Sequence, residues 1–264
     1  MKILYLGEIV GKPGRKAVKK ILPGLITKYK PDFVFANGEN LTHNKGINKK
    51  HLDEMLEVGI DYFTSGNHIF DNREFLPELE KKETPVIRPA NYPNGTPGRG
   101  FARVKKGKKQ ILLVNLIGRV FMLEGLTSPF FTADEILKNK QASDFVIVDF
   151  HAEATSEKLA LSYYLENKIN LFIGTHTHIP TADEEIRNNG MAYITDIGMI
   201  GPKESILGIK KEIIIEKFLN DSSIIHDIAL GDMIFNAILV EVEEKTKKAK
   251  KIQRIREVIL DEKK

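Results

Sequence analysis

The chain has 264 residues, a formal net charge of +4 and no cysteine, which excludes disulfides and thiolate metal sites and fits a reducing compartment. Any metal site must therefore use the side chains of His, Asp, Glu and Asn, which favour manganese, iron, magnesium or zinc over metals that prefer soft ligands. Because the N-terminal apolar run is too short for a signal peptide and no apolar run is as long as a membrane span, we expect a cytoplasmic protein without a membrane segment.

The first hundred residues alternate short apolar strands with helices. Strands are expected over residues 3–6, 32–36 and 62–63. Helices are expected from near Pro13 to about residue 28, from 48 to 57, and from 71 to about 81. The last of these is predicted to begin at Asp71, because Asp71 and Glu74 have the spacing of a capping box. A loop rich in Gly and Pro follows over residues 88–100.

The rest of the chain continues this alternation. We expect a hairpin (101–104 and 110–116), a loop (118–129) and a helix (133–140). A strand (145–150), a helix (156–166) and a strand (169–173) are expected next, followed by two strands around the turn at 188–190. Helix and loop of unclear packing (199–232) and two final strands (235–242 and 251–260) complete the chain. Strand–helix alternation predicts an α/β fold. We find no internal repeat and no low-complexity linker, so we expect one domain over residues 1–264.

Two basic runs, residues 105–109 and 245–251, contain much of the excess positive charge. A surface that binds RNA would combine such charges with aromatic side chains that stack on bases. Neither run contains an aromatic residue, so we interpret both as solvated turns between strands, and they give an RNA partner little support.

The tripeptide Gly66-Asn67-His68 is expected in a tight turn at the carboxyl end of the strand at 62–63. Open α/β sheets gather their chemistry at such ends. Asn67 offers an oxygen to a hard metal, and His68 offers an imidazole that can carry a proton near neutral pH. On its own, the tripeptide fits equally well a turn with a capping Asn and a half-exposed His.

Five expected strands each end in residues that can bind a metal. These are Glu8, Glu39-Asn40, Asn67-His68, His151 and His176-Thr177-His178. The carboxyl ends of parallel strands lie along one edge of a sheet, so these side chains can converge. Alternation along an extended segment would put His176 and His178 on the same side. One histidine at a strand end more often serves packing or capping, but five clusters in succession predict a metal site.

Six stretches resemble a known family. They are GEIVGKPGR at 7–15, NGEN at 37–40, GNH at 66–68, RPANYP at 88–93, NLIGR at 115–119 and GTHTH at 174–178. In this order they resemble the calcineurin-like metallophosphoesterase superfamily and, within it, the YmdB-like bacterial branch of cyclic-nucleotide phosphodiesterases. The resemblance implies a four-layer α-β-β-α sandwich of two mixed sheets, and a homo-oligomer, either a dimer or a tetramer.

The resemblance also implies a centre of two divalent ions, iron or manganese before zinc or magnesium. Glu39 would bridge the ions. The first ion would also bind Glu8, Asn40 and His178, and the second would bind Asn67, His151 and His176.

The implied reaction is the hydrolysis of 2′,3′-cyclic nucleotides such as 2′,3′-cyclic AMP. A metal-bridging hydroxide would attack phosphorus, and His68 would protonate the departing ribose oxygen as general acid. The loops that contain Asn91, Tyr92, Arg119 and Phe121 are candidate walls for base and ribose, although loop packing explains each of these residues equally well.

Glu8 departs from the superfamily pattern, which has Asp at this position. The additional methylene shifts the carboxylate by about 1 Å if the backbone stays in place, and a misplacement of that size can cost about 100-fold in rate. We favour an accommodated ligand, because every other ligand of the set is present. The alternatives are a catalytically weak regulatory protein that binds nucleotide or RNA through an altered metal site, and a phosphatase for another phosphate ester.

Overall fold

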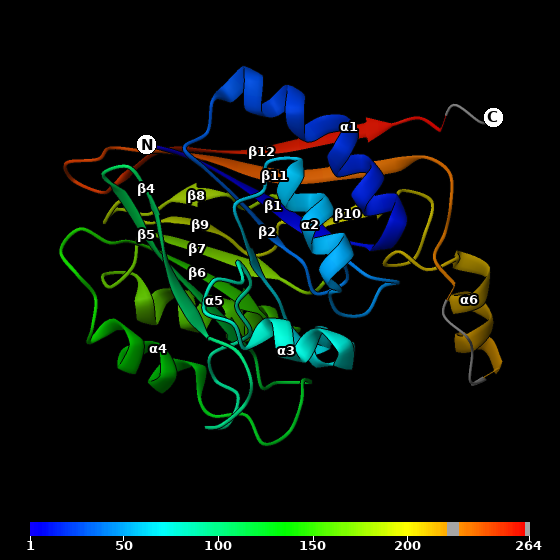
Figure 1. The fold of residues 1–264 in the computed structure, drawn as a ribbon, viewed down its shortest axis with the longest axis horizontal. Helices are drawn as coiled ribbons and strands as arrows, with labels where there is room; N and C mark the ends of the chain where they lie inside the picture. Colours follow the sequence, from blue (N-terminus) through cyan, green and yellow to red (C-terminus); the bar gives the residue numbers. More distant parts are fainter. Residues whose placement is uncertain (221–226, 262–264) are drawn as a thin grey trace.

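The computed structural model describes residues 1–220 and 227–261 and shows two stacked sheets (Figure 1). The first sheet has the strand order β12 (Ala249–Ile259), β11 (Met233–Val242), β10 (Met199–Pro202), β1 (Lys2–Ile9), β2 (Phe33–Asn37) and β3 (Tyr62–Thr64). The second has the order β4 (Phe101–Lys106), β5 (Lys109–Ile117), β6 (Phe145–His151), β7 (Leu171–Thr175), β9 (Ala192–Ile194) and β8 (Glu185–Ile186). Both sheets are mixed: β10, β1, β2 and β3 run parallel, as do β5, β6, β7 and β9, while β11, β12, β4 and β8 pair antiparallel to their neighbours.

Helices cover the outer face of each sheet. Figure 1 shows α1 (Gly11–Tyr29) and α2 (Lys49–Glu57) over the first sheet, and α4 (Pro129–Leu137) and α5 (Thr155–Leu165) over the second. Side chains of β1 alternate between two cores, because successive residues of a strand point to opposite faces. Leu4 packs with Leu22 of α1, whereas Tyr5 packs between the sheets with Leu113 of β5. A third core joins α4 and α5 to the second sheet. These layers confirm the predicted four-layer α-β-β-α sandwich.

The predicted helix over residues 71–81 is wrong. Two short 3-10 turns, Asn67–Phe70 and Arg73–Phe75, come first, and α3 covers only Leu76–Leu79. Proline inside a helix removes a hydrogen bond and clashes with the preceding turn, and Pro77 therefore lies in the first turn of α3. Asp71 does not cap a helix. Its carboxylate accepts a hydrogen bond from the His68 side chain instead.

Other boundaries differ from the prediction for local reasons. Helix α4 begins at Pro129, four residues before the predicted start, because proline is well suited to the first position of a helix. The segment 199–232, expected as helix and loop, contains a helix, α6 (Lys211–Asn220), but it also contains the strand β10. Residues 221–226 of this segment lie outside the described residues. A turn lies within each basic run as expected, between β4 and β5 and between β11 and β12, but residues 105–106, 109 and 249–251 belong to the flanking strands.

Helix α6 lies away from the two sheets (Figure 1), and none of its residues is buried. Within residues 1–220 and 227–261, no helix combines the length and apolar character needed to cross a membrane.

Candidate metal centre

The carboxyl ends of β1, β2 and β3 in one sheet meet those of β6 and β7 in the other. Seven predicted ligands come from these ends: Glu8, Glu39, Asn40, Asn67, His151, His176 and His178. Asn67 and His176 are half-buried, and the other five are buried. The convergence predicted from the strand ends is therefore present, but across two sheets and not along one edge.

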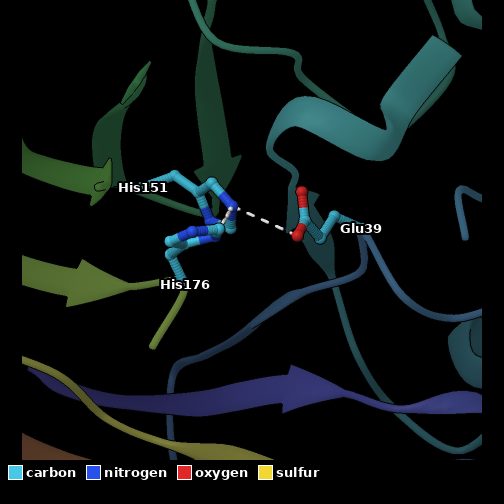
Figure 2. Close-up of side chains that lie close together, drawn as sticks. All are labelled: Glu39, His151 and His176. Atoms are coloured by element: carbon cyan, nitrogen blue, oxygen red, sulfur yellow. Dashed lines mark hydrogen bonds and ion pairs between the residues drawn. The ribbon is translucent and has the colours of Figure 1, made fainter. Parts of the chain in front are cut away.

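One group of side chains surrounds His151. Its Nε2 atom lies 3.1 Å from Oε1 of Glu39, 3.0 Å from Nδ1 of His176 and 3.2 Å from Oδ1 of Asn67. Figure 2 shows Glu39 reaching from its loop after β2 towards the two histidines of the opposite sheet. The ligand atoms of Glu39, His151 and His176 all lie within 4.8 Å of one another.

A second group surrounds Glu8. Its Oε1 atom lies 2.8 Å from Nε2 of His178 and accepts a hydrogen bond from the Asn40 amide. The Asn40 amide nitrogen is also 3.4 Å from Oε1 of Glu39, so Glu39 lies between the two groups. Among the described residues, the other amide atom of Asn40, its oxygen, is buried without a hydrogen-bond partner.

Two of these histidines have a backbone that L-residues seldom adopt. The φ angles of His176 and His178 are 99° and 65°, so the segment after Thr175 is a turn and not the extended strand that we expected. This turn directs His176 to the His151 group and His178 to the Glu8 group. Such uncommon backbone conformations cluster at functional sites, where the surrounding structure holds them in place.

Burial and proximity displace the pKa values of these groups in opposite directions. Burial raises the pKa of Glu8. Burial alone would lower the pKa of His178, but the facing Glu8 carboxylate raises it to about 9. Burial, together with the nearby His151, lowers the pKa of His176 to about 3. Burial opposes ionisation of Glu39, but the His151 imidazolium outweighs burial and lowers its pKa. The site therefore holds carboxylates and imidazoles close together and largely out of water.

The donor set fits divalent ions. Two nitrogens held by one ion at about 2.1 Å and at right angles lie about 3 Å apart, which matches the separation between His151 and His176. The unpartnered oxygen of Asn40 is a further hard ligand atom, and the mixture of imidazole, carboxylate and amide suits first-row divalent metals. His178 also donates from Nδ1 to the carbonyl of Leu207 at 3.1 Å, an outer contact typical of metal-binding histidines.

His68 belongs to neither group of ligand atoms. Its ring is half-buried, and its Nδ1 atom lies 2.8 Å from Oδ2 of Asp71. It lines a pocket of about 480 Å³ together with Glu39, His176 and His178. Asp71 thus fixes one ring nitrogen of His68 and leaves the other for a molecule in the pocket.

The four predicted substrate-binding residues, Asn91, Tyr92, Arg119 and Phe121, are not among those that line this pocket. Asn91 is buried and makes three hydrogen bonds to backbone groups of Ile117 and Thr127. Tyr92 packs against Phe70, and its buried hydroxyl has no partner among the described residues. Burial raises the pKa of Tyr92 to about 12.

Arg119 and Phe121 belong to the loop after β5. The backbone N–H of Arg119 donates to the carboxylate of Glu157, and Phe121 is exposed with a φ of 60°.

The sequence reasoning missed three sets of residues at the pocket: Glu153, residues of the segment 206–218, and Asn44 with Lys45. Glu153 lies 3.1 Å from Nε2 of His176, and its position two residues after His151 was the available signal. The second set comes from the segment 206–218, which has no pattern that connects it to the strand ends.

Comparisons with known proteins agree with this geometry. The sequence profile of YmdB-like proteins matches residues 4–255. A Bacillus subtilis (strain 168) protein named 2′,3′-cyclic-nucleotide 2′-phosphodiesterase is 43% identical over 256 residues, which cover 97% of this chain and 96% of the relative.

Two crystal structures superpose closely. A novel phosphatase from Mycoplasma pneumoniae has a TM-score of 0.94 at 36% identity, with 99% of this chain and 95% of that chain covered. A hypothetical protein from Thermus thermophilus has a TM-score of 0.92 at 37% identity, with 98% of this chain and 100% of that chain covered. Because the profile matches nearly the whole chain and the Bacillus subtilis relative matches it almost end to end, the chain belongs to the family of YmdB-like proteins.

Proposed function

We propose that the protein is a metal-dependent phosphodiesterase that hydrolyses 2′,3′-cyclic nucleotides, such as 2′,3′-cyclic AMP. The observation that carries this proposal is the buried Glu39 carboxylate, which lies between the His151 group and the Glu8 group at the base of a pocket. The name of the Bacillus subtilis relative supports the substrate class.

Glu39 would bind both of two divalent ions, manganese or iron, in the proposed centre. Glu8, Asn40 and His178 would hold one ion, and Asn67, His151 and His176 the other. When bound, two such ions polarise a phosphate ester and lower the pKa of water. The fold contributes by burying five of these seven ligands, which limits competing water.

His68 is the proposed general acid. Asp71 accepts the Nδ1 hydrogen of His68, which leaves Nε2 for the substrate, and in the imidazolium form Nε2 holds the second hydrogen that it can donate. In the hydrolysis, water adds its hydroxyl to phosphorus, the bond from phosphorus to the ribose O2′ breaks, and O2′ takes up a proton from His68. The product is a nucleoside 3′-monophosphate, and the second proton of the water leaves to solvent or to a base.

The experiment that tests this function measures product release from 2′,3′-cyclic AMP with added manganese. His68→Ala is expected to lower kcat by about 100-fold or more, because general acid catalysis contributes about that much. Asp71→Asn should lower kcat less, since the imidazole remains. The control is Glu74→Gln, because Glu74 is exposed, lies six positions after His68 and forms no ion pair with it among the described residues.

Binding of the cyclic nucleotide without turnover by the manganese-loaded wild type would reject an enzyme for this substrate and favour a regulatory binding protein. Full activity in His68→Ala would remove His68 from the mechanism.

We also propose a cytoplasmic homo-oligomer, either a dimer or a tetramer. Exposed apolar side chains away from the pocket support association, among them Phe121 and Phe131, which are 86% and 74% exposed. Light scattering of the purified protein measures its mass directly, and a monomer at micromolar concentration would contradict this part of the proposal.

A further inference from the structure

The pocket above the candidate metal centre has a second side that the proposed reaction does not use. Four of the predicted ligands, Glu39, Asn40, His176 and His178, line this pocket together with His68 and Glu153. Another part of the lining, the apolar wall, comes from one segment: Ile206, Leu207, Ile209, Ile214, Lys217 and Phe218. A pocket of about 480 Å³ is also larger than a phosphate group alone requires, since small-molecule sites occupy about 300–1,000 Å³.

The lower part of this wall is attached to the metal centre. Ile206 and Ile209 exchange two backbone hydrogen bonds of 2.9 and 3.0 Å and so form a tight turn. The carbonyl of Leu207 in that turn accepts from His178 at 3.1 Å. Gly208 fits closely against Val10, because a Cβ atom there would lie 2.6 Å from a Val10 methyl carbon. The wall is therefore held at a set distance from the ligands.

Helix α6 continues the wall with apolar side chains, none of which is buried. Ile214 and Phe218 are four residues apart, so they lie on the same face of the helix, and both line the pocket. Phe218 is 82% exposed. Leu219, the next residue, is 77% exposed but does not line the pocket. An exposed aromatic ring beside a polar site is suited to stack on a flat ligand.

The charged side chains of the pocket indicate which kind of ligand it can bind. Lys45 and Lys217 line the pocket, and neither forms an ion pair among the described residues. The pocket thus has an apolar wall with cations beside it and a cation-binding base. That combination fits a molecule with one flat apolar part and at least one anionic group, which describes a nucleotide better than a simple phosphate ester.

We propose that Phe218, supported by Ile214 and Leu207, forms the nucleobase subsite of this enzyme, with the base stacked on the Phe218 ring while the cyclic phosphate lies at the metal centre. This inference rests on the proposed phosphodiesterase function and deepens it. Every base has a π-face, so the subsite accepts all four nucleosides but binds the larger purines more tightly.

The test compares two substrates that differ only in the base: 2′,3′-cyclic AMP and 1-O-methylribose 2,3-cyclic phosphate. Phe218→Ala should raise KM for 2′,3′-cyclic AMP by about 10-fold with little change in kcat, because stacking on an aromatic side chain contributes about that much to affinity. KM for the substrate without a base should stay the same. Phe218→Trp should restore the low KM, and Leu219→Ala, the matched control on the same helix, should behave as wild type.

If Phe218→Ala raised KM equally for both substrates, the proposed subsite would be overturned. An unchanged KM for both substrates would overturn it as well. A shift of Phe218→Ala to a smaller oligomer would assign the α6 face to contact with a second copy of the chain and would also overturn it. Failure of the proposed function looks different, because the wild type would then hydrolyse neither substrate. In that case equilibrium binding of 2′,3′-cyclic AMP replaces KM, and equal dissociation constants for wild type and Phe218→Ala would reject the subsite.

Discussion

The hydroxyl of Thr175 lies 3.0 Å from Nδ1 of His151, and it connects this histidine to a buried carboxylate. Thr175 donates its only hydroxyl hydrogen to Oδ1 of Asp149 at 2.8 Å, so it accepts from His151. The Nδ1 atom of His151 therefore holds the hydrogen, and Nε2 faces Glu39 and His176. Asp149 is fixed in turn by the hydroxyls of Tyr5 and Thr64. Strand residues of both sheets thus orient one ligand of the candidate metal centre.

Thr175→Val should weaken metal binding about 10- to 100-fold, the effect typical of removing an outer partner of a metal-binding histidine. The two side chains have nearly the same shape, so the loss reflects the missing hydroxyl. Titration of the metal-free protein with manganese measures the affinity. Thr175→Ser keeps the hydroxyl and should bind metal as wild type. If the Val variant matched wild type in affinity and lost only thermal stability, Thr175 would have a structural role alone.

Glu8→Asp should weaken the site, even though Asp is the residue of the superfamily pattern. In this chain Glu8 reaches Nε2 of His178 at 2.8 Å, and its second oxygen accepts from the backbone N–H of His176 at 3.3 Å. Removing one methylene withdraws the carboxylate from both contacts, and a misplacement near 1 Å costs up to about 100-fold in rate.

Metal content by mass spectrometry and turnover of 2′,3′-cyclic AMP report this effect. Glu8→Gln keeps the length of the side chain but removes its negative charge. It therefore distinguishes the effect of a shorter side chain from the effect of a lost charge. Higher activity of Glu8→Asp than of wild type would show that Glu8 impairs the first site.

Lys158→Met should destabilise the fold by about 3 kcal/mol, because removing one partner of a buried ion pair leaves the other charge uncompensated. The ammonium of Lys158 lies 2.7 Å from the carboxylate of Asp196, and each side chain is 1% exposed. Asp196 also accepts from the N–H and hydroxyl of Thr177, between the two ligand histidines, so metal affinity should fall as well.

The matched control for this variant is Lys168→Met. Lys168 pairs with Asp134 at 2.6 Å, but these side chains are 38% and 33% exposed, so the loss should be about 1 kcal/mol or less. Urea unfolding at neutral pH measures both variants. Equal losses in free energy of unfolding would mean that burial does not distinguish the two pairs.

Asp32→Asn should lower stability at neutral pH and leave it unchanged in acid. Burial opposes ionisation of Asp32, but the Lys109 ammonium and the backbone N–H of Lys2, both at 2.7 Å, outweigh burial and lower its pKa. A carboxyl with a lowered pKa in the folded state stabilises the fold above its unfolded pKa of about 3.9, and this stabilisation is lost as the pH falls through the folded pKa.

We expect a difference of about 1 kcal/mol between wild type and Asp32→Asn at pH 7, after allowance for partial exposure, and none near pH 2. Urea unfolding at the two pH values gives the difference. Asp53→Asn, which removes an exposed pair with Lys49 within one helix, serves as the control. A difference that persists at pH 2 would mean that Asp32 acts through packing and not through its charge.

Local patterns in the sequence determined much of this protein. Apolar strand segments ending in Glu8, Glu39, Asn67, His151 and His176 predicted which residues would gather, because the carboxyl ends of strands collect side chains whatever the rest of the fold. The order of these clusters also identified the family. The expected helix at 71–81 failed, since the capping-box spacing around Asp71 competed with the helix-breaking effect of Pro77.

The tertiary structure alone decided which side chains face one another. Asn40 lies beside His178, 138 residues away, because β2 and β7 belong to different sheets whose ends meet across the cleft. No periodicity of 2 or 3.6 residues encodes such a contact, which depends on how the two sheets stack. The same reason explains why Asn91 anchors a loop, and why Phe218, on a helix with no buried residue, lines the pocket. Sequence periodicity determines which face of a helix or strand is buried, but only the packing of the whole chain determines which element lies against that face.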